Sequence, residues 1–368
     1  MTTIAKVSGP AHFLALIPSL LGFRPAQSLV AVPLRRGGSL GVLRVDLPPD
    51  DDLDACERVA SSVLGLMCRV AGVDAMIAVV YTDASARPAL PSPRLVDALL
   101  RACDVCGLPV ADVLVVGADG WGSPFDPLHP EEARPLEEIE TADAAGLPPV
   151  TQGQTDGADL PATTAAQRKA TGAALAHLRS ATGTGRRRKA RPVEPEVVEA
   201  AHALADPAAL AEHALRDDME LTPLRAATLA ACLGRPALRD VALVCWAEGL
   251  DAGKRAVTAQ QAWEDGEEYP PELALILWGD APRPDAARLR AALELVRHVA
   301  ALTPRSYRAG ALAACGWLAW ALGRSTHAEC YATAALAIDP AHGLGRIVLS
   351  FVSAGHLPEW AFTPPAAD

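Results

Sequence analysis

The spacing of hydrophobic residues changes twice along the chain, and these changes constrain the fold more than any other feature. Residues 11–116 alternate between helical periodicity and short runs of β-branched residues, as in α/β domains. Residues 119–195 show no sustained periodicity and are rich in Pro, Gly, Thr and charged residues. The rest of the chain shows helical patterns, apart from an irregular stretch with two tryptophans over 249–284. We therefore predict an α/β domain over 1–120, an irregular linker or long excursion over 121–194 and an α-helical domain over 195–368.

The first domain is expected to be a mixed sheet covered by helices. A short helix from Ala11 ends at Gly22, which suits a helix C-cap. Two strands around Gly37-Gly38 read as a hairpin, and Leu43, Val45 and Leu47 share one face of its second strand. Further helices and buried strands alternate, so the last two strands should be parallel. The expected ranges are helices 51–70 and 92–106, and strands 28–34, 40–47, 76–81 and 110–116.

Composition favours helices for the second domain. Half of the residues are hydrophobic but only 4% are aromatic, so the cores must consist largely of Leu, Val and Ala. The segment from Arg308 to Pro340 resembles one tetratricopeptide-type helix pair, in which small residues let two helices approach closely. It predicts either a groove that holds a peptide or an ordinary helical hairpin. The matching positions are Leu312, Gly316, Ala319, Ala328, Ala335 and Pro340.

Charge and hydropathy narrow the possible partners and the compartment. The formal net charge of -11 argues against broad nucleic-acid binding and against an anionic membrane surface. The longest uncharged run, residues 309–323, is shorter than a membrane-spanning helix requires, and no export signal is evident. We therefore expect a cytoplasmic protein whose eight cysteines are reduced thiols.

Two carboxylates follow predicted strands and are the candidate catalytic residues. Asp83 comes after the strand that ends in Tyr81, and Asp119 after the strand that ends at residue 116. Ligands of open α/β sheets bind outside the carboxyl ends of strands, so the pair could act as acid and base or hold a metal. The alternative, which we weight more heavily, is that each carboxylate caps a neighbouring turn or helix.

Arg24, Arg44 and Asp46 are candidate ligand-binding residues, together with Tyr81. Arg44 and Asp46 lie two residues apart on one strand and therefore share a face. An ion-pair network that fixes the hairpin is the simpler interpretation. An anion or partner site that uses both arginines is the alternative, since guanidinium groups match phosphate and carboxylate.

Other motifs predict no established chemistry. The pair Cys103 and Cys106 lies at the end of a predicted helix rather than at its start, where a reactive thiol would be favoured. The glycines between 117 and 122 lack the following helix of a dinucleotide site. No zinc-ligand spacing or serine-hydrolase motif occurs, so we predict no metal site and no cofactor. The basic run from Arg186 to Arg191 could bind an acidic partner or simply be solvated.

Several of these segments resemble an uncharacterised domain-of-unknown-function family of high-GC Gram-positive bacteria. The resemblance implies a bacterial cytoplasmic origin and no particular reaction. It is carried by Leu20-Leu21-Gly22-Phe23-Arg24-Pro25, Ser28-Leu29-Val30, Arg44-Val45-Asp46-Leu47-Pro48, Ile77 to Asp83, Leu238-Arg239-Asp240, Gly316 to Trp320 and Gly355-His356-Leu357-Pro358-Glu359-Trp360.

The sequence leaves two hypotheses for the function of this protein. The first is an interaction or regulatory protein that binds a protein or peptide through its C-terminal helices. The second is an enzyme that acts on an anionic small molecule near Asp83 and Asp119, with Arg24 or Arg44 binding the anionic group.

Overall fold

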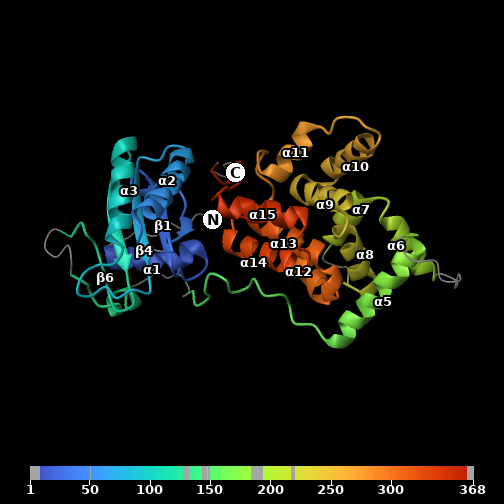
Figure 1. The fold of residues 1–368 in the computed structure, drawn as a ribbon, viewed down its shortest axis with the longest axis horizontal. Helices are drawn as coiled ribbons and strands as arrows, with labels where there is room; N and C mark the ends of the chain where they lie inside the picture. Colours follow the sequence, from blue (N-terminus) through green and yellow to red (C-terminus); the bar gives the residue numbers. More distant parts are fainter. Residues whose placement is uncertain are drawn as a thin grey trace. The chain divides into compact units, whose positions relative to one another are not determined.

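The computed structural model describes residues 9–49, 51–126, 132–142, 147, 150–183, 194–216 and 220–362. The chain forms two compact units, Met1–Asp156 and Gly157–Asp368 (Figure 1). The first is an α/β unit and the second is helical, as the hydrophobic pattern predicts.

The first unit is built on one mixed sheet with the order β2-β1-β4-β5-β6, in which β3 also pairs with β1. β1 is antiparallel to β4, β4 is parallel to β5, and β5 is antiparallel to β6. The predicted hairpin is present, with Ser28 opposite Asp46 and Ala31 opposite Leu43. Its second strand is interrupted at Gly41, where φ is 150°. The strands are β1 (Ser28–Arg35), β2 (Gly38–Ser39), β3 (Leu43–Asp46), β4 (Ala75–Tyr81), β5 (Val110–Val116) and β6 (Trp121–Gly122).

Helices cover both faces of this sheet. α2 (Leu53–Arg69) and α3 (Pro93–Cys106) pack on one face, where alternate strand residues such as Ala78 join their core. α1 (Pro10–Leu21) and the short α4 (Glu137–Glu140) pack on the other face, around Trp121. The period-two alternation of the strands therefore supplies two separate cores.

The second unit is an assembly of helices around α13 (Ala309–Ala321), whose residues are all buried. An amphipathic pattern would not predict such a helix, because it is apolar on every side. The surrounding elements are α5 (Ala165–Ala181), α6 (Pro195–Ala203), α7 (Pro207–Ala214), α8 (Pro223–Leu233), α9 (Pro236–Glu248), α10 (Leu250–Glu264), α11 (Pro271–Trp278), α12 (Ala286–Leu302), η1 (Arg305–Tyr307), α14 (Ser325–Leu336), α15 (Gly343–Ser353) and η2 (Glu359–Ala361).

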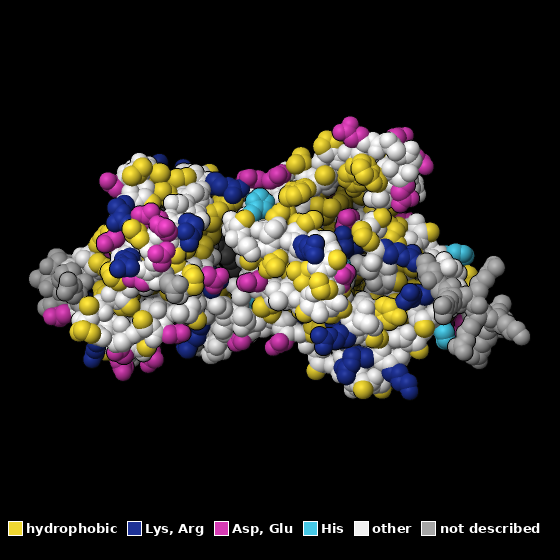
Figure 2. Space-filling model, in the orientation of Figure 1, with side chains coloured by type: hydrophobic (Ala, Val, Ile, Leu, Met, Phe, Trp, Pro, Cys, Tyr) yellow, Lys and Arg dark blue, Asp and Glu magenta, His cyan; other side chains and the backbone are white. Residues whose placement is uncertain are grey.

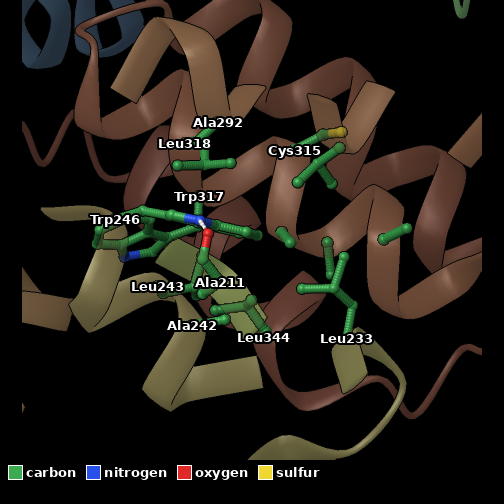
Figure 3. Close-up of a cluster of buried hydrophobic side chains, with 14 of the residues drawn as sticks. Ala211, Leu233, Ala242, Leu243, Trp246, Ala292, Cys315, Trp317, Leu318 and Leu344 are labelled. Carbon is green, nitrogen blue, oxygen red and sulfur yellow. Dashed lines mark hydrogen bonds between the residues drawn. The ribbon is translucent and has the colours of Figure 1, made fainter. Parts of the chain in front are cut away.

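Tryptophans join helices that are distant in sequence. In Figure 3, Trp246 of α9 and Trp317 of α13 lie in the same apolar cluster, and the Trp246 indole N–H donates to the Ala211 carbonyl of α7 at 3.0 Å. Trp317, Trp320 and Trp360 also donate their indole N–H to backbone carbonyls, at 2.7–3.0 Å. Each ring thus buries a large apolar area while its one polar group stays bonded.

The helix pair expected over Arg308–Pro340 is formed by α13 and α14. Their connection is three residues long, so the helices run antiparallel. Gly316 allows close approach, since a Cβ there would lie 3.3 Å from the Ala328 carbonyl oxygen. Whether the pair is a true tetratricopeptide unit stays a prediction.

The segment expected as a linker, 121–194, is divided between the two units. β6 and α4 belong to the first unit, because β6 pairs with β5 and Ile139 of α4 packs beside Trp121. α5 belongs to the second, where it packs against α8. The basic run from Arg186 to Arg191 lies outside the described residues. In the part of the chain that the structure describes, no helix combines the length and apolarity needed to cross a membrane.

Candidate functional site

Asp119 stabilises the loop that follows β4. One carboxylate oxygen accepts from the Ser85 hydroxyl at 2.7 Å, and the other accepts from the Ala86 backbone N–H at 2.7 Å. These two hydrogen bonds lower the pKa of the Asp119 carboxyl, the Ser85 bond most strongly. The side chain thus holds a loop in the way the capping alternative describes.

Asp83 does not join Asp119. The Asp83 backbone N–H donates to the Gln27 side-chain oxygen at 2.8 Å, and its carboxylate is exposed. Among the described residues, no hydrogen bond links the two carboxylates. They also do not belong to a metal-binding group, because no cluster of three or more His, Cys, Asp or Glu in the described ranges could hold an ion.

Arg44 is nearly buried, with only 10% of its side chain exposed, and its guanidinium bonds to several side chains. Its guanidinium donates to Asp46 at 2.5 Å, to the Ser28 hydroxyl at 2.7 Å and to the Gln154 side-chain oxygen at 3.0 Å. The first contact is the ion pair considered for the hairpin. The contact with Gln154 was not foreseen, because it joins residues 110 positions apart.

Arg24 lies beside the same distant segment rather than in the ion pair. Its backbone N–H donates to the Gln152 carbonyl at 2.7 Å, and its Nε donates to the Val150 carbonyl at 3.1 Å. A parallel bridge also joins Arg24 to Gly153. The N-terminal motif therefore binds residues 150–156 of its own chain, which we call the docked segment.

Tyr81 is not available as a ligand residue at the strand end. Its hydroxyl is buried without a hydrogen-bond partner among the described residues, on the sheet face of α1. Burial raises the pKa of the Tyr81 hydroxyl far above its ordinary value, so it stays protonated.

The two cysteines of the Cys103–Cys106 pair have different surroundings. Cys103 is buried against Met76, with its Sγ 3.6 Å from the Met76 sulfur, whereas Cys106 is exposed. Burial raises the pKa of the Cys103 thiol to about 11, so it is not an activated nucleophile.

The second unit exposes apolar side chains and carboxylates along the end of α10, the loop that follows it, and α11. Trp263 and Trp278 are 56% and 51% exposed, and Leu275 between them is 42% exposed. Figure 2 shows hydrophobic side chains between α10 and α11, bordered by Asp and Glu side chains. We call these three residues and the intervening exposed acidic residues the α10–α11 surface; the acidic residues are Glu264, Asp265, Glu267, Glu268 and Glu272.

The end of α11 is held firmly. The carbonyl of Leu277 accepts from the Trp317 indole at 2.9 Å, and the carbonyl of Gly279 accepts from the Glu359 N–H at 2.8 Å. The Trp278 ring lies 5.3 Å from the ring of Phe351, centroid to centroid. Trp278 is therefore fixed in place while half of its surface stays exposed.

Sequence reasoning did not select these tryptophans, because 249–284 showed no clear periodicity. The available signal was the composition of 263–272, in which an aromatic residue precedes a run of carboxylates.

A charged cluster lies near the start of α15. The His342 Nδ1 caps this helix by accepting from the Gly345 N–H at 3.2 Å. Burial, together with nearby Arg239, lowers the pKa of His342, whereas burial raises the pKa of the Asp240 carboxyl. Arg239 is itself buried and pairs with Asp240 at 2.8 Å. The Leu238-Arg239-Asp240 motif thus forms an ion pair between a buried arginine and a partly exposed carboxylate beside a helix cap.

Comparison with known proteins shows that residues 10–267 match the model of the domain of unknown function DUF4192. The match spans the first unit and continues through α10, and it ends within the acidic run of the α10–α11 surface. No curated protein and no solved structure matches the chain. Because the matched region covers well over half of the 368 residues, the chain belongs to the DUF4192 family of domains of unknown function.

Proposed function

We propose that this protein is an interaction or regulatory protein of the cytoplasm and that its helical unit binds a partner through the α10–α11 surface. The observation that carries this proposal is the exposure of two tryptophans, 56% and 51%, in a unit that buries its other four. Tryptophan is enriched among the residues that carry most of the binding energy of interfaces, so exposed tryptophans bordered by charged residues are candidates for contact with a partner.

The charges around these tryptophans suggest the chemistry of the partner. Five exposed carboxylates lie between residues 264 and 272, and none of them forms an ion pair among the described residues. They would attract Lys and Arg side chains and would repel an acidic surface. The partner we propose is a basic protein segment with apolar side chains that cover Trp263 and Trp278.

The rigidity of α11 supports this role. Hydrogen bonds from Trp317 and Glu359 hold the backbone on either side of Trp278, so little conformational entropy would be lost when a partner binds.

The test is a comparison of proteins captured from native lysate by the full-length chain and by its variants. We expect at least one basic partner that is lost with Trp263→Ala/Trp278→Ala and retained with Val198→Ala, a change of another exposed apolar residue of the same unit. Capture should weaken as salt rises, and reversing charge with Glu267→Lys/Glu268→Lys should weaken it further. Identical capture by the wild type and the double tryptophan variant at every salt concentration would refute the proposal.

The enzymatic alternative finds no comparable support in the described residues. Both oxygens of Asp119 serve the loop after β4, Arg44 is paired with Asp46, and Tyr81 is buried without a partner.

A further inference from the structure

Three arginines gather where the start of α5 meets η1. Arg168 lies near the N-terminal end of α5, Arg305 opens η1, and Arg308 follows η1 directly. Segments more than 130 residues apart in sequence are thus brought together, and the sequence pattern did not indicate it.

Hydrogen bonds to shared atoms place two of the guanidinium groups close to one another. Arg168 Nη1 donates to the Thr163 hydroxyl at 2.9 Å, and that hydroxyl donates to the Ala301 carbonyl at 3.1 Å. Arg308 Nη2 donates to the same carbonyl at 3.4 Å. One hydroxyl and one carbonyl therefore separate Arg168 from Arg308.

The same bonds fix the orientation of the arginines and leave donors free. Arg308 is held by the Thr303 carbonyl, at 3.1 Å from Nε and 2.9 Å from Nη2, and Arg168 by the Thr163 carbonyl at 2.6 Å. Among the described residues, no hydrogen bond uses Arg168 Nε or Nη2, Arg308 Nη1 or any nitrogen of the Arg305 side chain. These donors remain for a ligand.

Among the residues that the structure describes, no carboxylate pairs with an arginine of the cluster. Burial, and then the charges of Arg168 and Arg305, lower the pKa of Arg308. α5 itself carries Arg168, Lys169 and Arg179 but no Asp or Glu, although the whole chain has a net charge of -11. Figure 2 shows Lys and Arg side chains gathered in the region of α5. An anion would relieve this repulsion.

We propose that Arg168, Arg305 and Arg308 form a binding site for a phosphate-type dianion. Planar guanidinium forks held in fixed positions match the oxygens of a phosphoryl group, and two or three of them can share one such group. The dianion is inorganic phosphate or the terminal phosphate of a small monoester, which present the same chemistry to the site.

The test is calorimetric titration of the full chain with inorganic phosphate and, separately, with glycerol phosphate, at constant ionic strength. We expect binding by the wild type and a roughly tenfold or greater loss of affinity in Arg305→Ala, the lower range for a hydrogen bond to a charged group. Arg305 has no partner in the described fold, so this change removes no structural contact. Arg290→Ala, at an exposed arginine of α12 outside the cluster, should leave affinity unchanged.

A further variant separates the effect of the planar guanidinium geometry from the effect of the positive charge. Arg168→Lys keeps the charge but loses the planar geometry, and we expect it to weaken phosphate binding while the unfolding transition stays close to that of the wild type.

Tighter binding of glycerol phosphate identifies an ester as the ligand, and equal binding identifies the free anion; either supports the site. The proposal is wrong if neither compound binds at millimolar concentration, or if Arg290→Ala weakens binding as much as Arg305→Ala. It is equally wrong if duplex DNA binds through these arginines while phosphate does not.

Discussion

Replacing Gly310 with alanine tests whether α13 is as closely packed as the structure indicates. Gly310 lies in the first turn of α13, against the end of α8. A Cβ at this position would overlap the Leu233 carbonyl oxygen and would lie 2.8 Å from the Gly234 Cα. Both are backbone atoms, so relief requires one helix end to move by about 1 Å, in a core packed as densely as a crystal.

Two opposing effects set the size of the change. Alanine is favoured over glycine inside a helix by at most about 1 kcal/mol. Overpacking a core costs about 1–3 kcal/mol, and the upper part of that range applies because the obstructing atoms are backbone. We therefore expect the free energy of unfolding of the helical unit to fall by about 2 kcal/mol.

The measurement is urea unfolding followed by tryptophan fluorescence, because six of the seven tryptophans belong to the helical unit. With a denaturant slope of about 2 kcal/mol per molar urea, the midpoint should decrease by about 1 M. Gly343→Ala is the matched control: this exposed glycine opens α15 and has no atom near its Cβ position, so the change should stay within about 0.5 kcal/mol. A midpoint for Gly310→Ala equal to or above that of the control would refute the close approach of α8 and α13.

Three further predictions concern pH, the docked segment and the thiols. The pKa of His342 is lowered in the folded state, so below about pH 6.5 the unfolded state binds more protons and the protein loses stability as the pH falls. His342→Asn keeps a helix cap, and thermal unfolding should show that this variant loses less stability between about pH 7 and about pH 5.5. Asp240, whose pKa is raised, acts in the opposite direction at lower pH, and a pH dependence unchanged by the substitution would contradict the assignment. Arg44→Ala removes the bonds to Ser28, Asp46 and Gln154, so limited proteolysis should cut within 150–156 faster than in the wild type, while Arg69→Ala should not change that rate. In the native protein a thiol reagent should modify two exposed cysteines, Cys68 and Cys106, well before the buried ones. Burial raises the pKa of the Cys245 thiol to about 11, so rapid modification of Cys245 would contradict the packing of α7 and α9.

Much of the first unit could be predicted because its signals are local. Gly22 ends α1 in the left-handed conformation with φ at 80°, and its N–H donates to the Pro18 carbonyl, as its position in the sequence indicates. Alternation within a strand likewise separates the two sheet faces before any pairing is known. The candidate site was harder, since the partner of Arg24 and Arg44 is a segment that has no periodicity of its own.

The helical unit shows where local signals are insufficient. α10 and α11 were not predicted. α13 was expected from the helix pair over Arg308–Pro340 and not from an amphipathic pattern, because other helices surround it on all sides. The ionic clamp in which Arg288 of α12 pairs with Glu212 of α7 is equally invisible in sequence, because the two residues lie 76 positions apart.

The sequence by itself determined the class of each unit, the end of α1, the presence of the hairpin and the family, because each depends on neighbours or on short motifs. Only the tertiary structure decided which charged groups meet. It paired Arg44 with the docked segment, assigned Asp119 to a loop, left Trp263 and Trp278 exposed, and brought Arg168 to Arg308. Such juxtapositions follow from the packing of helices and strands that are far apart in the chain, and a single amino-acid sequence carries no local signal for these contacts.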